Sequence, residues 1–346
     1  MKHSLANYSL NIEEEAYHAY PAWSYSVIAK YAKEGFSAIK NLHDKVEPTA
    51  SMKFGSLFDS ILTRGKKTLD YYAVMDMTVP DAERKALDYI SSRTDEVFAD
   101  LSPEYIYNCC QECGYQTRWK MDTVYNKLLP YKDYYDMTKS GKEIVSQQEW
   151  DDAVEMAKIY RNDPYLKDIF GTKNTDDVEY LYQLQFVQDV TLPSGKTVTV
   201  KCMPDLIVVN HKDKTVQPVD LKTSAMPAYE FSDNFLKYRY DIQAQLYSDI
   251  LTIIMKQDDE LKEYHILPYL FSDISRSDKV PVTYVYDQTD ESQANGFSFK
   301  SGDKTYQYKH WSDLLDEILE YEAAEAKVPS YIRLDGPNYL LDILGR

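Results

Sequence analysis

The segment from residue 179 to residue 223 constrains the fold most, because its sequence pattern is that of strands divided by turns. In its first part the apolar positions are Tyr180, Tyr182, Leu184 and Phe186, which is typical of a strand with one buried face. Two turn signals, Pro193–Lys196 and His211–Lys214, divide the segment. They separate three predicted antiparallel strands, Glu179–Gln188, Val198–Val209 and Val216–Thr223.

Helical patterns flank these strands. Apolar residues at helical spacing predict helices from Trp23 to about Leu42, from Phe54 to Leu62, and from about Tyr229 to about Met255. Strands enclosed by helices predict an α/β (α+β) protein with a mixed central sheet flanked by helices. Residues from about 81 to 170 read as polar helices, and we expect a helical insertion or lid packed on the core rather than an independent domain. The whole chain, 1–346, is expected to be a single domain with core elements at about 20–65 and 175–275 and an extension at 276–346.

Composition narrows the classes of protein. The formal net charge of −17 argues against a nonspecific nucleic-acid binder, although Lys30–Lys67 carries eight basic and four acidic residues. The chain shows no apolar run of signal-peptide or transmembrane length, so a cytoplasmic protein without membrane association is expected. In a reducing compartment, the four cysteines are expected to be free thiols. A zinc site at Cys110 and Cys113 is the weaker alternative, since no second pair follows at useful spacing.

The C-terminal extension contains one clear helical pattern. Polar strands and turns are expected over 276–310, including Ser301–Asp303, and Ser312 is predicted to cap a helix that runs to about Ala326. The other face of this helix is acidic, with Asp313, Asp316, Glu317, Glu320 and Glu322. Two interpretations stay open: a solvated helix surface, and a contact between subunits.

Spacing around the second turn brings charged residues together. If Lys212 and Asp213 form a two-residue hairpin loop, the residues that face each other across it have numbers that sum to 425. Asp205 and Asp220 are then direct cross-strand neighbours, with Cβ atoms about 5 Å apart. Lys222 lies on the same face as Asp220, because side chains alternate along a strand. Pro218 is a complication, because proline cannot donate to the ladder and can force a bulge.

Two opposed carboxylates beside a lysine indicate a metal site. Like charges directly opposed in a hairpin are unfavourable unless a cation lies between them. Mg²⁺, with Mn²⁺ as a substitute, suits such a site, because it binds one or two carboxylates, waters and a phosphate. A metal ion in this position would activate a water molecule and polarise a phosphate, while Lys222 orients or deprotonates the water or neutralises charge. The alternative is a solvated hairpin with scattered charges.

The helix after Lys222 carries a polar stripe. Arg239, Gln243 and Tyr247 recur at every fourth position and so lie on one helix face. A cation, an amide and a phenol in a row suit contacts with a phosphate and a strand end. An ordinary solvent-facing stripe is the alternative interpretation.

These motifs together carry a family resemblance. Met203-Pro204-Asp205, Val219-Asp220-Leu221-Lys222-Thr223 and Gln243-Ala244-Gln245-Leu246-Tyr247 resemble the motifs of the PD-(D/E)XK nuclease superfamily. The last of the three resembles its RecB-like branch, and the overall match is most similar to RecE-type (exodeoxyribonuclease VIII-like) phage exonucleases. Looser similarity lies in Phe54–Asp59, in Arg161–Pro164 and at Ser24 and Ser26, and the resemblance covers about residues 20–275. It implies a restriction-endonuclease-like core.

The resemblance also implies roles for individual residues. Asp205 and Asp220 would bind the metal, with the Leu221 carbonyl and Glu179 completing its shell, and Lys222 would be the catalytic lysine. Asp59 stands where the family commonly has histidine, so its role as a metal ligand is in doubt. Arg239, taken from the polar stripe, and Gln243 and Tyr247, which match the family motif, are the candidate substrate contacts. No iron–sulfur cluster is expected, because no cysteine follows Tyr247, and the chain has no phosphate loop of an ATPase.

The resemblance favours a Mg²⁺-dependent exonuclease that resects double-stranded DNA ends in phage or prophage recombination. Its expected setting is a bacterial or phage-infected cytoplasm, with DNA ends as substrate. A single-strand annealing protein and a homo-oligomeric ring are implied by analogy. Two alternatives stay open: a catalytically inactive relative that binds DNA or a recombination partner, and an acidic helical interaction protein with a coincidental motif.

Overall fold

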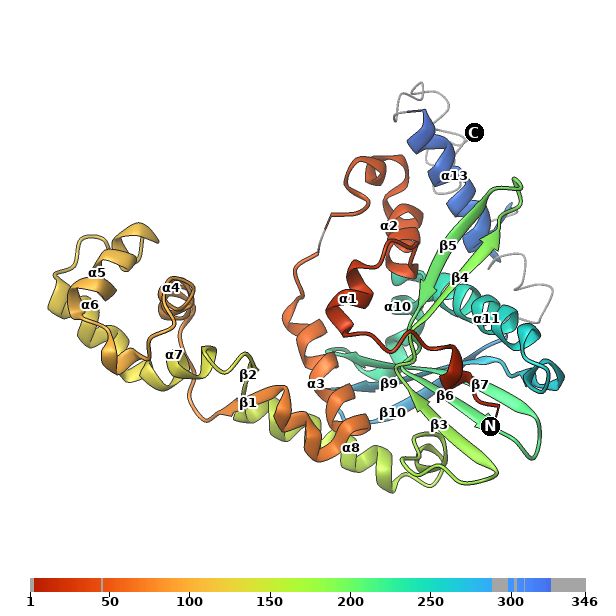
Figure 1. Cartoon of the computed structure of the whole chain (residues 1–346), viewed down its shortest axis with the longest axis horizontal. Coiled ribbons are helices and arrows are strands. Elements are labelled where there is room, and N and C mark those ends of the chain that lie inside the picture. Colours follow the sequence, from red (N-terminus) through yellow and green to blue (C-terminus); the bar gives the residue numbers. More distant parts are fainter. Residues whose placement is uncertain (1–2, 45, 288–297, 302–303, 308, 325–346) are drawn as a thin grey trace. The chain divides into compact units, whose positions relative to one another are not determined.

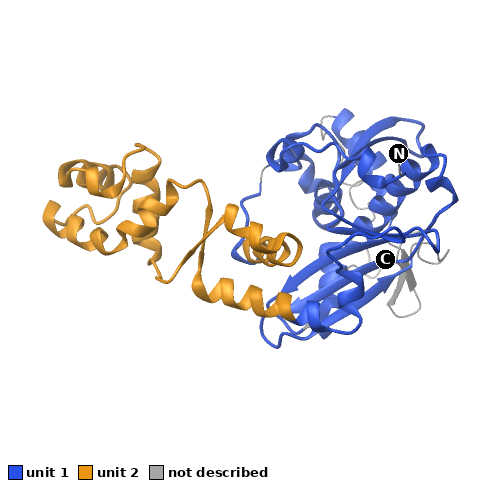
Figure 2. Ribbon diagram, turned by 60° about the horizontal axis from the view of Figure 1, so that its bottom comes forward, with its two compact units in different colours: residues 1–51, 159–346 blue, residues 52–158 orange. Residues whose placement is uncertain are grey.

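The computed structural model describes residues 3–44, 46–287, 298–301, 304–307 and 309–324. The chain divides into two compact units, which Figure 2 shows in different colours. The first unit combines Met1–Ser51 with Ile159–Arg346, and the second is Met52–Lys158. The segment 325–346, which belongs to the predicted C-terminal extension, and residues 302–303 of the predicted turn lie outside the described residues.

A mixed six-stranded sheet forms the centre of the first unit (Figure 1). Its main path has the order β10-β9-β7-β6-β3, and β8 pairs with β7. Strands β8 and β9 run parallel to β7, whereas the other pairs are antiparallel. The predicted class, a mixed sheet flanked by helices, is confirmed. The strands are β3 (Val178–Tyr182), β6 (Leu206–Asn210), β7 (Thr215–Ser224), β8 (His265–Ile266), β9 (Tyr269–Ser275) and β10 (Pro281–Tyr286).

The first predicted hairpin is broken halfway along both of its strands. Tyr182 pairs with Leu206, and Phe186 pairs with Cys202, so the register continues across two three-residue gaps, 183–185 and 203–205. Beyond the gaps, β4 (Phe186–Thr191) and β5 (Thr197–Cys202) form a separate two-stranded sheet. Gln183 adopts a left-handed conformation with φ of 50°, which ends β3. The prediction of two continuous strands was therefore wrong.

This break also reverses the predicted faces of β3. Glu179 and Leu181 are buried, whereas Tyr180 and Tyr182 are half-buried on the opposite face. Their phenol groups donate to the backbone carbonyls of Asp168 and Gly171, which lets each tyrosine keep a polar end satisfied. Side chains do alternate between the two faces of the strand, but the face that a given position occupies changes at Gln183.

Helices cover the face of the sheet that carries Leu181, Ile207 and Val209. Apolar side chains of three of these helices share one hydrophobic core with those strand residues, and the fourth packs Phe231 against Phe271 in a second cluster. The helix predicted from about Tyr229 to Met255 is interrupted at Arg239, which has φ of 57°. The helix predicted from Trp23 ends at Glu34, because Gly35 takes φ of 62°. The helices on this face are α2 (Tyr25–Glu34), α10 (Phe231–Tyr238), α11 (Tyr240–Gln257) and α13 (Trp311–Ala323).

The C-terminal helix α13 forms as predicted but starts two residues earlier. His310, not Ser312, is the N-cap, and its ring nitrogen accepts from the Ser312 backbone N–H. Part of the acidic face binds within the chain: Asp316 accepts from the Ser194 backbone N–H and hydroxyl, and Glu317 accepts from Tyr31. The helix surface is therefore not simply a solvated row of carboxylates.

Shorter elements complete the first unit. The two parallel strands β7 and β9 are joined by α10 and α11, since parallel strands need a long crossover. On the opposite face of the sheet, Tyr160 of α8 hydrogen-bonds Ser272 at 2.8 Å. Helix α8 (Gln147–Asn162) begins in the second unit and enters the first at Ile159. The remaining elements of the first unit are η1 (Leu5–Tyr8), α1 (Glu14–Ala19), η2 (Gly35–Asn41), α9 (Leu166–Ile169), η6 (Ala228–Glu230), η7 (Leu261–Glu263), β11 (Ser298–Ser301) and β12 (Lys304–Gln307).

The second unit contains most of the predicted insertion and has its own hydrophobic core. This core includes Leu87, Phe98, Ile106, Leu128 and Tyr135. The unit extends beyond the expected insertion, from Met52 instead of residue 81. Its elements are α3 (Ala50–Arg64), η3 (Gly65–Asp70), β1 (Tyr72–Met75), α4 (Asp81–Ser91), η4 (Phe98–Asp100), α5 (Pro103–Glu112), α6 (Met121–Leu128), η5 (Leu129–Tyr131), α7 (Lys132–Thr138) and β2 (Glu143–Ser146).

Two further expectations concern thiols and membranes. All four cysteines are free thiols, and Cys113 is the exposed one. Among the described residues, no helix combines the length and apolarity needed to cross a bilayer.

Candidate active site

Two carboxylates meet at the break between the sheet and the β4–β5 hairpin. Leu206 pairs with Val219 and Val209 with Val216, so the predicted register is confirmed and passes through Pro218 without a bulge. Asp205 immediately precedes β6 and is therefore placed opposite Asp220 of β7. The Asp205 carboxylate accepts a hydrogen bond from the Leu221 backbone N–H at 2.7 Å, which holds it beside β7.

A closed polar network surrounds Asp220, which is only 2 % exposed. Its Oδ2 lies 2.5 Å from Nζ of Lys222, which lies on the same face of the strand as predicted. Its Oδ1 accepts a hydrogen bond from Nε2 of Gln243, and Oε1 of Gln243 accepts from Nζ of Lys222 at 3.3 Å. Gln243, on the first turns of α11, therefore fixes the carboxylate and the ammonium relative to each other.

Lys222 carries a positive charge in this arrangement. Burial alone would lower the pKa of Lys222, but the acidic groups of Asp220, Tyr240 and Asp205 beside it outweigh this effect, so the net pKa lies above its usual value. Its Nζ also lies 4.6 Å from the ring centre of Tyr240, within the range of a cation–π contact. With the protein alone, Lys222 is thus a fixed cation next to two acidic groups.

Tyrosines enclose the other side of the site. Tyr247 of α11 is partly exposed, and its ring contacts the buried Tyr269 of β9 with ring centres 6.4 Å apart. Burial raises the pKa of Tyr247 well above its usual value, and nearby groups, Asp220 and Asp205 among them, add to this effect. The structure thus brings Gln243 and Tyr247 to the carboxylates, as predicted.

Arg239 does not face the site as predicted. It lies between α10 and α11, is 3 % exposed, and forms two hydrogen bonds to Asp241, from Nε at 2.9 Å and from a terminal nitrogen at 3.0 Å. The expected stripe of three substrate contacts is therefore reduced to two. The helix break removes Arg239 from the spacing on which the prediction depended.

Glu179, one of the predicted metal ligands, is not brought to Asp205 and Asp220. Glu179 pairs with Val209, four register positions from the level of Asp205, which corresponds to roughly 13 Å along a strand. Its carboxylate accepts from the Ser4 hydroxyl at 2.9 Å and lies 3.4 Å from His211, so it stabilises the far end of the sheet. Asp59 is half-buried on α3 in the second unit, and its role stays a prediction.

A third acidic residue, Asp273, was missed by the sequence analysis. Asp273 of β9 is the register partner of Lys222, so both side chains point to the same face of the sheet. It is 1 % exposed and accepts a hydrogen bond from the Ser224 hydroxyl at 3.3 Å. An acid within the apolar run Tyr269–Ser275 was the available signal, but its position depends on a parallel pairing that no local spacing predicts.

Asp273 is expected to make stability depend on pH. Burial raises its pKa to about 6, although Ser224 and Lys222 oppose this effect. An acid with a raised pKa in the folded state binds more protons there, so the contribution of Asp273 to the wild-type free energy of unfolding falls as pH rises from about 4 to about 6. A pKa shift of one unit corresponds to about 1.4 kcal/mol. From pH 4 to pH 8, the free energy of unfolding of Asp273→Asn should therefore rise by about 3 kcal/mol relative to that of the wild type.

Urea denaturation in metal-free buffer at both pH values measures this difference. Asp233→Asn, on the exposed surface of α10, is the matched control and should show no such gain. A difference between Asp273→Asn and wild type that does not change with pH would contradict the prediction.

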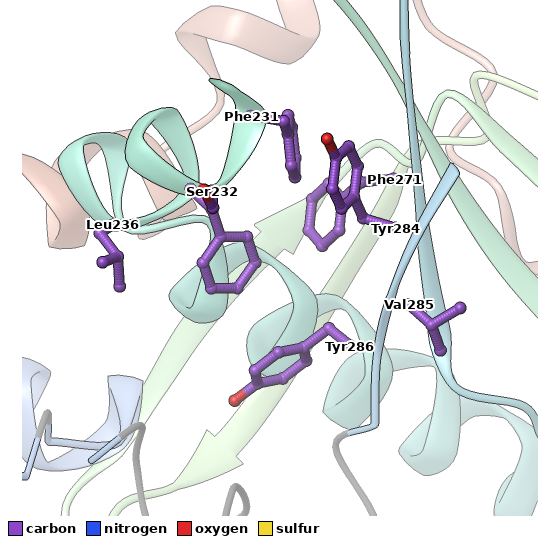
Figure 3. Close-up of a pocket in the computed structure, with 8 residues that line it drawn as sticks. Phe231, Ser232, Leu236, Phe271, Tyr284, Val285 and Tyr286 are labelled. Atoms are coloured by element: carbon purple, nitrogen blue, oxygen red, sulfur yellow. The ribbon is translucent and has the colours of Figure 1, made fainter. Parts of the chain in front are cut away.

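An aromatic pocket borders the site at the edge of the sheet (Figure 3). It has a volume of about 260 Å³ and lies between α10 and the strands β9 and β10. Phe231 stacks on Tyr284 with ring centres 4.4 Å apart, and Tyr240 stacks on Phe231 and Phe271 at 5.8 and 5.7 Å. The rings that line this pocket therefore also support Tyr240, the ring beneath Lys222. The pocket is lined by Phe231, Ser232, Phe235, Leu236, Phe271, Tyr284, Val285 and Tyr286.

Comparisons with known proteins add no family to this geometry. The chain matches no protein-family model and no curated protein. Within the described residues, no group of three or more His, Cys, Asp and Glu side chains is assembled to hold a metal ion.

Proposed function

We propose that the protein is a Mg²⁺-dependent deoxyribonuclease of the PD-(D/E)XK type. One observation carries the proposal: Asp205 and Asp220 occupy opposed positions at a break in the sheet, with the Lys222 ammonium 2.5 Å from Asp220. Opposed carboxylates destabilise a hairpin, and a divalent cation bound by both would relieve their repulsion together with the Lys222 ammonium. The mixed sheet with β7 between β6 and β9 supports the finer proposal of a restriction-endonuclease-like core.

The residues present fit Mg²⁺. Asp205 and Asp220 supply hard oxygen donors, and Mg²⁺ commonly binds one or two carboxylates, with waters and a phosphate in its other positions. We assign the Leu221 carbonyl as a further donor, because Leu221 lies between the two key residues of β7 and its N–H already holds Asp205. When bound, Mg²⁺ would polarise the scissile phosphate and lower the pKa of a water molecule.

The protein's own groups then have separate tasks. The Lys222 ammonium is a cation held in place before substrate arrives, so it stabilises the negative charge that grows on a phosphate during attack without reorganisation. Gln243 holds Lys222 and Asp220 at a fixed separation. Tyr247 and Gln243 border the space that a strand end would occupy.

Exonuclease action on duplex ends, in phage or prophage recombination, is the mode that the sequence resemblance favours. A single-strand annealing protein as partner and a homo-oligomer belong to the same proposal. The catalytically inactive alternative predicts that residues of the site are missing. Here Asp205, Asp220 and Lys222 are all present: Lys222 contacts Asp220, and the strand register places Asp205 opposite Asp220.

The proposal is tested by incubating the wild-type protein and Mg²⁺ with an end-labelled linear duplex and, separately, with a covalently closed circle. Degradation of the linear duplex alone is expected for an exonuclease. Cutting of the circle would support a nuclease but contradict the assignment as an exonuclease. If neither DNA is cut in Mg²⁺ or Mn²⁺ by folded protein, the nuclease proposal is wrong.

A further inference from the structure

An exposed tyrosine near the site carries two lysines on its ring. Tyr238, the last residue of α10, is 38 % exposed. The ammonium groups of Lys33 on α2 and Lys237 on α10 lie 5.8 and 5.1 Å from its ring centre. Among the described residues, neither ammonium forms an ion pair, so both charges are open to a ligand. This group of Lys33, Lys237 and Tyr238 is called the tyrosine platform below.

The tyrosine platform is connected directly to the candidate active site. Tyr238 stacks on Tyr240 with ring centres 5.7 Å apart and an angle of 28° between the rings. Lys222 lies 4.6 Å above the Tyr240 ring, so 4.6 Å plus 5.7 Å gives an upper limit of 10.3 Å between the Lys222 ammonium and the Tyr238 ring centre. Stacked nucleotides advance about 3.4 Å each along one strand, so the platform lies within about three nucleotides of the scissile phosphate.

The backbone around Tyr238 is built to hold this position. Arg239 has φ of 57°, a conformation that is unfavourable for a residue with a side chain, and it turns the chain so that Tyr238 and Tyr240 stack on each other. The buried ion pair between Arg239 and Asp241 holds the turn. The Tyr25 hydroxyl donates to the Tyr238 carbonyl at 2.6 Å and ties the platform to α2. The strained conformation of Arg239 is thus held by contacts among α2, α10 and α11, which indicates a rigid site.

We propose that the tyrosine platform binds single-stranded DNA next to the catalytic centre, with a base stacked on Tyr238 and phosphates on Lys33 and Lys237. This inference rests on the proposed nuclease function. Proteins that bind single strands combine cationic grooves with aromatic rings on which bases stack. The chain as a whole has a net charge of −17, so a phosphate backbone is repelled from most of the surface and is accepted where unpaired lysines meet.

Binding of a fluorescein-labelled oligothymidylate of about 12 nucleotides tests this proposal, measured by anisotropy in EDTA at low salt, where no metal-dependent cleavage occurs. Tyr238→Ala is expected to weaken binding about ten-fold or more, because one base loses its stacking surface. Tyr238→Phe keeps the ring and should bind like wild type. Tyr229→Ala, which removes a tyrosine that is 73 % exposed, is the matched control.

The lysines give a second readout. With Lys33→Gln and Lys237→Gln combined, the slope of log K against log salt should decrease by about 1.4, since each phosphate contact on a single strand contributes about 0.7. Equal binding by Tyr238→Ala and Tyr229→Ala, or an unchanged salt slope, overturns the platform even if the wild type cuts DNA. Conversely, if the protein binds single strands through Tyr238 but cuts no DNA, the tyrosine platform is supported and the proposed nuclease function is contradicted.

Discussion

Asp220→Asn is expected to lower the rate of Mg²⁺-dependent DNA cleavage by about 10³-fold. Its carboxylate is one of two proposed metal ligands and also fixes Lys222, so its loss removes several kcal/mol of charge stabilisation, and each 1.4 kcal/mol is tenfold in rate. Single-turnover digestion of an end-labelled duplex measures the effect. The replacement is nearly isosteric, so the fold should survive.

Asp213→Asn provides the matched control for Asp220→Asn. Asp213 lies in the turn of the same hairpin, is exposed, and hydrogen-bonds Asn210. It should cleave at the wild-type rate. If Asp220→Asn retains more than about a tenth of wild-type activity, Asp220 is not a ligand of the catalytic metal and the proposed site is wrong.

Asp241→Ala is expected to destabilise the first unit by about 3–5 kcal/mol, because it removes the carboxylate that is paired with the buried charge of Arg239. Arg239 and Asp241 are 3 % and 2 % exposed, and their two hydrogen bonds hold the turn between α10 and α11. Urea denaturation measures the change in the free energy of unfolding. Tyr238 and Tyr240 flank this turn, so the variant should also lose Tyr238-dependent binding of single strands.

The double variant Arg239→Met and Asp241→Leu distinguishes two effects on stability: that of removing one partner of the ion pair and that of removing the whole pair. Replacing both charges with apolar groups is expected to restore most of the lost stability, since burying an ion pair is costly in itself. A loss below about 1 kcal/mol in Asp241→Ala would show that the pair does not fix the turn.

Local spacing predicted the hairpin that carries the site. The turn at 211–214 sets the register, and the register alone places Asp205 opposite Asp220 and Lys222 beside it. Two of the departures from the prediction arise at non-glycine residues with positive φ, Gln183 and Arg239. Both are ordinary residue types within good periodic patterns, and non-glycine residues rarely adopt this conformation, so neither break had a signal in the sequence.

The rest of the site depends on contacts between distant segments. Asp273 reaches Lys222 through the parallel pairing of β7 with β9, and these strands are separated in the chain by α10 and α11. Tyr240 reaches Lys222 only because the chain turns at Arg239. Glu179 fits the strand pattern but lies four positions too far along β3. Local spacing therefore predicted the positions of the central carboxylates and lysine better than those of their neighbours.

The most direct test of the proposed nuclease compares Lys222→Ala with Lys212→Ala, which removes an exposed lysine from the turn of the same hairpin. Both variants and the wild type are purified in parallel and incubated with an end-labelled linear duplex in Mg²⁺ and in EDTA. We predict cleavage in Mg²⁺ by the wild type and Lys212→Ala, none by Lys222→Ala, and none by any protein in EDTA. Equal cleavage by Lys222→Ala and the wild type would contradict the assignment of the active site to Asp205, Asp220 and Lys222.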